Sequence, residues 1–425
     1  MNNEQLMTRA ADNIRILAAS MVERAKSGHP GGAMGGADFI NVLFSEFLIF
    51  DPNDPKWPGR DRFFLDPGHM SPMLYAQLSL IGKYSMQELQ QFRQWGSPTP
   101  GHPEVDVLRG VENTSGPLGQ GHTFAVGAAI AAKFLAERLG WVMSQTIYAY
   151  ISDGGVQEEI SQGAGRIAGH LGLDNLIMFY DANNIQLSTK VDEVDTEDVA
   201  MKYKAWGWHV LEVDGSSASE IRKALAEAKS IVGKPTLIIG HTTMARGAVG
   251  ADGTSYEGKV STHGQPLSAA GASFEATVQN LGGDPNDPFR IFPEVEAMYQ
   301  ARLDVLRQLA EERKKEEALW RQDNKDRAEK LDRWFSGVSP VIDWSKVEQK
   351  PDQATRAASA TILGVLAQQV ENMIVASADL SNSDKTDGFL KKTRALTRGD
   401  FGGAFLQPGV AELTMACLCI RMALH

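Results

Sequence analysis

The stretch from residue 146 to residue 185 constrains the fold most, because it has the pattern of a βαβ unit. Residues 146–151 are mostly apolar, β-branched or aromatic, which predicts a buried strand. Residues 158–171 have helix-compatible spacing, and residues 175–180 form a second apolar run. In such a unit, the residues just past the carboxyl end of each strand line a ligand crevice. The sequence therefore predicts a binding site at one edge of a parallel sheet.

Polar residues and glycines follow both of these predicted strands. Asp153 comes just after the first strand, and Asn183 comes just after the second. A carboxylate and an amide oxygen suit Mg²⁺, which prefers oxygen ligands and keeps phosphate oxygens among them. Gly154 and Gly155 leave room for a phosphate group close to the backbone. An Asp-Gly pair after a strand is also common in plain turns, so spacing alone leaves both interpretations open.

Strands and helices continue to alternate beyond this unit. Residues 208–213 and 235–240 are further predicted strands, with helical spacing over residues 218–230 between them, and residues 62–65 form an earlier strand. This alternation predicts an α/β fold with a doubly wound, largely parallel sheet. Further helices are expected over residues 6–26, 37–47 and 124–139.

Composition narrows the classes of function. The net charge of −11 argues against nucleic acid and against an anionic membrane surface as partners. The two cysteines, Cys417 and Cys419, lie in an apolar stretch and form neither a disulfide framework nor a zinc pattern, which favours a reducing compartment. The amino terminus lacks the layout of a signal peptide, and no apolar run is long enough to span a membrane. We therefore expect a cytoplasmic protein.

The chain is expected to contain a large first domain and the beginning of a second. The first covers residues 1–335, and its charged final part, residues 294–335, predicts helices that pack an apolar stripe on the domain. A partner-binding helix is the alternative for that part. Residues 336–353 are expected to be the linker, because they contain glycine and prolines. The second α/β unit is expected over residues 354–425, with a strand over residues 373–377.

Three of the nine histidines lie in loops rich in glycine and proline. They are His29, His69 and His102. One histidine in such a loop is usually a surface residue. Several neutral imidazoles at one site would suit proton transfer on a polyhydroxylated substrate near pH 7.

Several motifs occur together in the order found in one enzyme family. The run SDGG, an intervening helix and YDANN resemble the thiamine diphosphate signature, in which GDG is followed by NN. The resemblance extends through SGHPGGAMGGAD, DPGHMSPMLY, TPGHPE, NTSGPLGQGH, VSTHGQP and GAFLQPGVAELTMA. Together these resemble the amino-terminal two thirds of a transketolase. Ser152 departs from the signature, which usually has glycine there.

The resemblance implies a function and a cofactor. The expected activity is the transfer of a two-carbon ketol group from a ketose phosphate to an aldose phosphate, as in the pentose phosphate pathway. The expected cofactor is thiamine diphosphate with Mg²⁺, for which Ca²⁺ or Mn²⁺ can substitute. Close alternatives are dihydroxyacetone synthase and 1-deoxyxylulose-5-phosphate synthase, and the histidine set with TPGHPE favours transketolase.

The resemblance implies functional roles for the matching positions of this chain. The expected ligands of the metal ion, which also lie at the cofactor, are Asp153, Asn183 and the carbonyl of Ile185. The other expected contacts of the cofactor are His69, Gly116, Leu118, Gly154, Asp379 and Glu412. The residues expected to act in catalysis and bind the substrate are His29, His102 and His263. The residues expected to hold the phosphate of the donor sugar are Arg356 and Ser383.

Glu412 receives the central catalytic role from the resemblance. In the family, such a carboxyl group hydrogen-bonds to the aminopyrimidine of the cofactor and promotes loss of the C2 proton of the thiazolium ring. Burial among Val410, Leu413 and Met415 is expected to raise the pKa of Glu412. A glutamate that simply favours the helix dipole is the plainer alternative. Glu158 is expected to be catalytic and to lie near Glu412 of a second subunit in a homodimer.

Transketolases continue beyond the position of His425, through the rest of the second domain and a third. We therefore expect the second α/β domain to be incomplete here, with poor stability after the linker and weak activity of this chain alone. The alternative from another functional class is a catalytically incompetent fragment. Such a fragment would bind cofactor or pair with an intact or complementary subunit.

Overall fold

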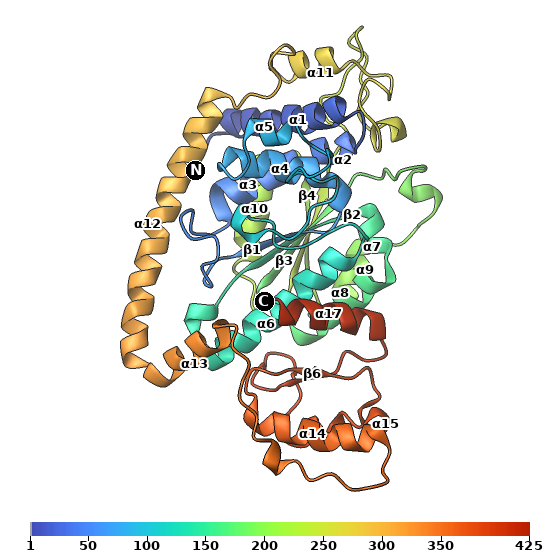
Figure 1. Ribbon diagram of the computed structural model, residues 1–425. Helices are drawn as coiled ribbons and strands as arrows, with labels where there is room; N and C mark the ends of the chain where they lie inside the picture. The colour runs from blue at the N-terminus through green and yellow to red at the C-terminus, as the bar shows by residue number, and fades with distance from the viewer. Residues whose placement is uncertain (1) are drawn as a thin grey trace.

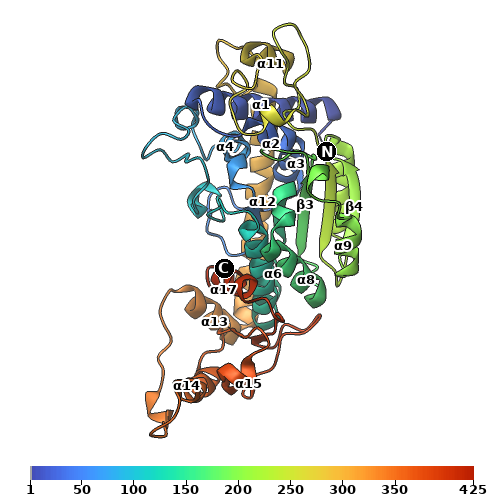
Figure 2. The ribbon, with the colours of Figure 1, turned by 90° about the vertical axis from the view of Figure 1, so that its right-hand side faces the viewer.

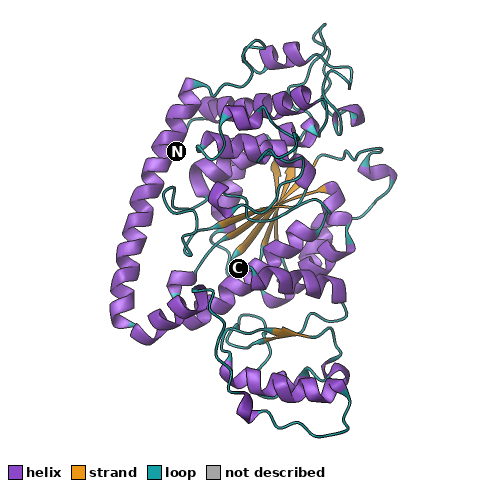
Figure 3. Ribbon diagram, in the orientation of Figure 1, coloured by secondary structure: helices purple, strands orange, loops and turns teal. Residues whose placement is uncertain are grey.

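The computed structural model describes residues 2–425, and at its centre is a parallel sheet (Figures 1 and 3). The five strands are β1 (Arg62–Leu65), β2 (Ile147–Ser152), β3 (Leu176–Ala182), β4 (His209–Asp214) and β5 (Thr236–His241). Their order is β1-β2-β3-β5-β4, and every neighbouring pair is parallel. The predicted α/β fold is therefore confirmed, and each predicted strand is present with its ends shifted by two residues at most.

Helices cover both faces of this sheet. Side chains of β2 alternate between two cores, with Tyr148 and Tyr150 in one and Ile147, Ala149 and Ile151 in the other. The helices that contribute to the first core include α1 (Glu4–Ala25), α2 (Pro30–Gly35), α3 (Ala37–Val42), α4 (Ser71–Leu80) and α10 (Ala218–Ala228). Those that contribute to the second include α6 (Gln120–Leu139), α8 (Glu159–Leu171) and α9 (Val199–Ala205). The sheet is doubly wound, as predicted.

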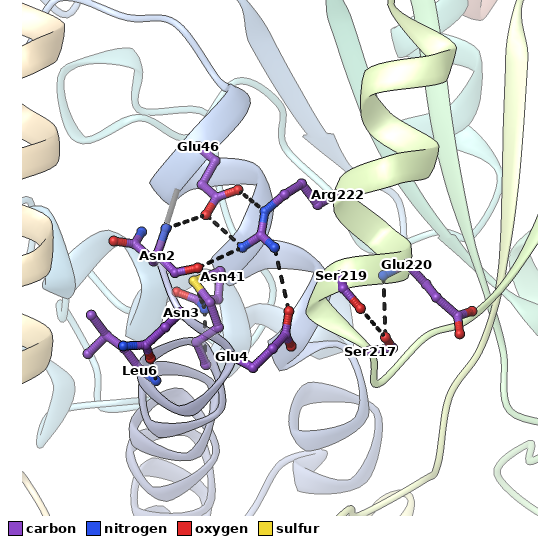
Figure 4. A network of polar contacts seen from close by, with 11 residues as sticks. Asn2, Asn3, Glu4, Leu6, Asn41, Glu46, Ser217, Ser219, Glu220 and Arg222 are labelled. Atoms are coloured by element: carbon purple, nitrogen blue, oxygen red, sulfur yellow. Dashed lines mark hydrogen bonds and ion pairs between the residues drawn. The ribbon is translucent and has the colours of Figure 1, made fainter.

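The expected helix over residues 37–47 changes its winding partway. It begins as α3 and continues as a π-helix over Leu43–Phe47. Glu46 of this segment pairs with Arg222 of α10, and the Nη2 group of Arg222 also donates to the carbonyl of Asn2 at 3.3 Å (Figure 4). The guanidinium nitrogens lie 2.5 and 2.9 Å from the carboxylate oxygens of Glu46. This contact joins α10 to the start of the chain.

The charged segment forms two helices along the outside of the molecule, α12 (Pro293–Asp323) and α13 (Lys325–Phe335) (Figure 1). The apolar stripe of α12 includes the buried residues Val295, Met298 and Leu303. The buried Tyr299 hydroxyl lies 2.8 Å from the side-chain oxygen of Asn41. The stripe packs on α1 and α4, so the packing interpretation of this segment is the one that the structure supports.

Residues after the expected linker form a small α/β unit at one end of the molecule (Figures 1 and 2). It contains α14 (Thr355–Gln369) and a parallel pair of two-residue strands, β6 (Val375–Ala376) and β7 (Phe405–Leu406), so the strand expected over residues 373–377 is shorter than predicted. The short helices α15 (Ser381–Asp384) and α16 (Asp387–Leu390) lie between the two strands along the chain. Across residues 2–425, the structure contains no helix with the length and apolar character needed to cross a membrane.

The last helix, α17 (Glu412–Ala423), leaves this unit and packs on α6 (Figures 1 and 2). The two helices meet at Gly127, where a Cβ would lie 2.7 Å from the carbonyl oxygen of Leu418. The Arg421 side chain donates to the carbonyl of Glu112 at 3.1 Å. Cys417 is buried on this helix, and Cys419 is partly exposed. These contacts hold α17 against the part of the chain that contains the five-stranded sheet.

The close approach at Gly127 predicts that a larger residue there will displace α17. Gly127→Leu should overpack the contact at a cost of about 1–3 kcal/mol and expose Arg421 to trypsin. We expect cleavage after Arg421 in this variant and resistance in the unsubstituted chain, as measured by limited proteolysis and mass spectrometry. Glu137→Leu, at an exposed position of the same helix, is the control and should stay resistant. Equal resistance of both variants would show that α17 does not depend on this contact.

Candidate functional site

A cavity of about 560 Å³ opens at the carboxyl end of the sheet. Every site residue predicted between positions 29 and 263 lines it. These are His29, His69, His102, Gly116, Leu118, Asp153, Gly154, Glu158, Asn183, Ile185 and His263. The four predicted site residues after the expected linker do not line it. These are Arg356, Asp379, Ser383 and Glu412.

Asp153 lines this cavity, at the start of the short helix α7 (Asp153–Gln157). It follows β2 directly, and its buried carboxylate accepts hydrogen bonds from the Tyr180 hydroxyl at 2.6 Å and the Asn183 N–H at 3.3 Å. Burial raises the pKa of Asp153 to about 7, and the nearby Asp181 carboxylate also raises it. A cation at this position would favour the charged carboxylate.

The residues around Asp153 fit a metal-bound diphosphate. Asp181 accepts hydrogen bonds from the Tyr150 hydroxyl at 2.7 Å and from the Thr242 hydroxyl. The hydrogen-bond donors to Asp153 and Asp181 are thus all neutral groups. Across residues 2–425, His, Cys, Asp and Glu side chains form no metal-binding group of three or more. A mixed set of one carboxylate, the amide oxygen of Asn183 and a backbone carbonyl is what this edge of the sheet offers, and it suits Mg²⁺.

Three histidines from distant loops meet on one wall of the cavity. His29 precedes α2, His69 follows β1, and His263 follows a short 3₁₀ turn. The ring centroid of His29 lies 5.0 Å from that of His69 and 5.8 Å from that of His263. The centroids of His69 and His263 are 5.4 Å apart. His102 lies at the same cavity, from a fourth loop.

Burial keeps these imidazoles neutral. It lowers the pKa of His29 to about 4, with smaller contributions from His263, Arg93 and His102. Burial also lowers the pKa values of His69, His102 and His263. Within the part of the chain that the structure describes, the Nδ1 atoms of His29 and His263 are buried without a hydrogen-bond partner. Both atoms are enclosed by protein and are not open to the cavity.

At the glycine-rich loop before α6, a carboxylate of the protein occupies the start of the helix. The N–H groups of Gly119 and His122 already donate to the carboxylate of Asp66, each at 3.1 Å. Burial raises the pKa of Asp66 to about 6, and these hydrogen bonds oppose the increase. The start of the helix is thus occupied by a side chain of the protein, whereas Gly116 and Leu118 line the cavity ahead of it.

Sequence reasoning missed residues at and behind the cavity wall. Asp66, which does not line the cavity itself, has a sequence signal, because it follows an apolar strand directly, as Asp153 does. Gln157 and Gln186 are neighbours of the two loops at Asp153 and Asn183, and their side chains join at 2.8 Å. Their adjacency to those motifs could have identified them.

The expected burial of Glu412 is wrong for this chain. Glu412 is exposed at the first position of α17, and its neighbours Val410 and Leu413 are 75% and 68% exposed. The face of α17 that packs on α6 and α8 contains other residues, which are Thr414, Cys417, Leu418 and Arg421. Glu412 lies on the opposite face, and its position in the first turn also fits the plainer role at the helix dipole.

The remaining three predicted residues are also exposed. Arg356 lies on α14, Asp379 follows β6, and Ser383 lies on α15. Asp379 has a left-handed backbone with φ of 64°. The structure does not bring these residues together with the cavity, because the unit that carries them lies at the far end of α6 (Figure 1).

The low pKa of His29 predicts that its ring stays neutral well below pH 7. The folded chain should bind fewer protons than the unfolded chain as the pH falls from 6.5 towards 4, so this residue lowers stability on acidification. In NMR spectra the His29 Cε1–Hε1 resonance, assigned with His29→Gln, should show no midpoint between pH 8 and pH 5.5. A midpoint near the ordinary value of 6.5 would contradict the burial argument.

Comparison with known proteins identifies the family. Residues 6–340 match the family described as "Transketolase, thiamine diphosphate binding domain". The chain is 38% identical to "Transketolase-1, chloroplastic" of Arabidopsis thaliana, over 100% of this chain and 57% of that protein. It is also 38% identical to the transketolase of Geobacillus stearothermophilus, over 98% of this chain and 62% of that protein.

Solved structures agree with this result. The transketolase from Leishmania mexicana superposes with a TM-score of 0.92 at 34% identity, over 98% of this chain and 62% of that one. The Campylobacter jejuni transketolase gives a TM-score of 0.86 at 36% identity, over 100% and 64% of the two chains. The chain thus spans about three fifths of the length of the curated relatives. With the matching fold and the motifs gathered at one cavity, the chain belongs to the transketolase family.

Proposed function

We propose that this chain acts in ketol transfer, moving a two-carbon unit from a ketose phosphate to an aldose phosphate. The observation that carries the proposal is the meeting of Asp153 and Asn183 with three neutral histidines in one cavity. One end of this cavity suits a metal-bound diphosphate, and the other suits a polyhydroxylated substrate. The family membership supports the same assignment.

The metal-binding end is assigned to Asp153, Asn183 and the carbonyl of Ile185. These groups would hold Mg²⁺ on the diphosphate of thiamine diphosphate, while Gly154 leaves space beside it and Leu118 packs on the cofactor. When bound, thiamine diphosphate supplies an electron sink for the transferred two-carbon group. The raised pKa of Asp153 is consistent with a carboxylate that needs a cation to be stable in its charged form.

The histidine wall is assigned to the substrate. His29 and His263 line the cavity with neutral rings, which can form hydrogen bonds with sugar hydroxyls. His102, which is exposed and lines the cavity, lies where it can contact the substrate too, and His69 is assigned to the cofactor. A neutral imidazole can accept a proton at one nitrogen and donate at the other, so these residues can move protons between sugar hydroxyls near pH 7.

The residues after position 335 are assigned to a site completed between subunits. In our proposal, residues 1–335 and 354–425 are two domains joined by the linker over residues 336–353. Glu412 of one chain would face Glu158 of its partner in a homodimer. The exposed apolar side chains of Val410 and Leu413 beside Glu412 support this, because a partner would remove them from water.

Three other residues are assigned to the same composite site. Asp379 would contact the cofactor, and Arg356 and Ser383 would hold the donor phosphate, for which the arginine fork is well suited. The two free cysteines are consistent with a cytoplasmic location.

The test of the proposal is ketol transfer by the 425-residue chain, supplied with thiamine diphosphate, Mg²⁺, a ketose phosphate and an aldose phosphate. Asp153→Asn should lower the rate at least about 100-fold. Changing a residue that only hydrogen-bonds to a metal ligand already costs about 10–100-fold, and Asp153 is assigned as a ligand itself. Asp304→Asn, which changes an exposed aspartate on α12, is the control and should leave the rate unchanged. Cofactor binding without any transfer by the unsubstituted chain would instead indicate a cofactor-binding module.

A further inference from the structure

Asp66 lies where three loops of the cavity meet. It follows β1 directly, and none of its surface is exposed. The loops that pack around it are the turn with His69, the glycine-rich loop with Gly116 and Leu118, and the turn after β2. Asp66 is not among the residues that line the cavity, so it is not placed to touch a substrate or a cofactor.

Asp66 is attached to the glycine-rich loop at both ends of the loop. Its Oδ2 atom accepts the N–H of Gly119, and its Oδ1 atom accepts the N–H of His122, each at 3.1 Å. Its backbone carbonyl accepts the Ser115 hydroxyl at 2.7 Å. The loop over residues 115–119 is therefore held against the end of β1.

The backbone segments around Asp66 are too close together for side chains. A Cβ at Gly155 would lie 2.6 Å from Oδ2 of Asp66, and a Cβ at Gly121 would lie 2.4 Å from its Cα. Next to the loop, a Cβ at Gly119 would lie 2.8 Å from the Cβ of Glu158. Asp66 thus sets the spacing between the glycine-rich loop and the turn after β2.

We propose that Asp66 is a positioning residue of the cofactor site, which holds Leu118 against the turn at Gly154. The contact that it maintains forms the cavity wall, where a Cβ at Gly154 would lie only 2.9 Å from Cδ1 of Leu118. The inference rests on the proposed function, because it connects this geometry with the binding of thiamine diphosphate.

A carboxylate is needed at this position because both of its oxygens accept. Asparagine has the same shape, but an NH₂ group replaces one oxygen. At position 66 that group would face the N–H of either Gly119 or His122, and one N–H at the start of α6 would lose its buried acceptor. The packing volume stays the same, so the substitution isolates the hydrogen bonds.

Asp61 provides a matched control at the other end of β1. It is 6% exposed, and its carboxylate accepts the N–H of Thr146 at 2.9 Å and that of Ile49 at 3.1 Å. It does not line the cavity at the carboxyl end of the sheet. Asp61→Asn therefore disturbs the same kind of interaction on the same strand, away from the site.

The test compares the unsubstituted chain with Asp66→Asn and Asp61→Asn. We expect both substitutions to lower the melting temperature. Asp66→Asn alone should speed hydrogen exchange at the amides of residues 116–122 and raise the dissociation constant for thiamine diphosphate with Mg²⁺ about tenfold. In turnover, its KM for the cofactor should rise while kcat at saturating cofactor is retained.

Equal affinity of the two variants would overturn the inference, and so would unchanged exchange at the start of α6 in Asp66→Asn. Should Asp66→Asn fail to fold, Ser115→Ala removes the bond at the other end of the loop and should weaken cofactor binding in the same direction; unchanged binding would overturn the inference. A chain that binds no thiamine diphosphate before substitution would overturn the proposed function itself. If both aspartate variants weaken cofactor binding equally, the positioning role of Asp66 is overturned and the proposed function is not.

Discussion

The register in which β2 pairs with β3 is the constraint on which the site depends. Ser152 lies opposite Asp181, so Asp153 and Asn183 leave the sheet next to each other. A slip by one residue would send each side chain of β2 to the other face of the sheet. The burial of residues 147–151 in two separate cores opposes such a slip, because tyrosines fill one core and smaller aliphatic side chains fill the other. Packing far from the cavity therefore determines which groups meet in it.

Burial disfavours charge on both sides of the cavity, with different consequences. It raises the pKa of the Asp153 carboxyl, and a bound cation would counteract this effect. It lowers the pKa of His29 and of its neighbours, which leaves imidazoles able to accept and donate protons. Burial of these titratable groups at one cavity thus suits a metal-bound diphosphate at one end and proton transfer on hydroxyl groups at the other.

Local sequence patterns were enough to predict the strands and the residues that follow them. β1, β2, β3 and β5 are buried on both faces and are largely apolar runs, whereas the edge strand β4 is only partly buried. The packing of helices and loops on one another could not be predicted in this way. The exposure of Glu412 depends on which face of α17 packs at Gly127, and nothing in the sequence near Glu412 specifies that face. Asp66 finds its partners 53 and 56 positions away, and the histidine rings meet only because three loops pack together.

The most direct test of the account is a crystal structure of the chain with thiamine diphosphate and Mn²⁺, with the metal located by its anomalous scattering. The account predicts one metal ion within coordination distance of oxygens of Asp153, Asn183 and Ile185, beside the diphosphate. A metal bound elsewhere, or a diphosphate away from the ends of β2 and β3, would contradict the claim that strand register creates this site.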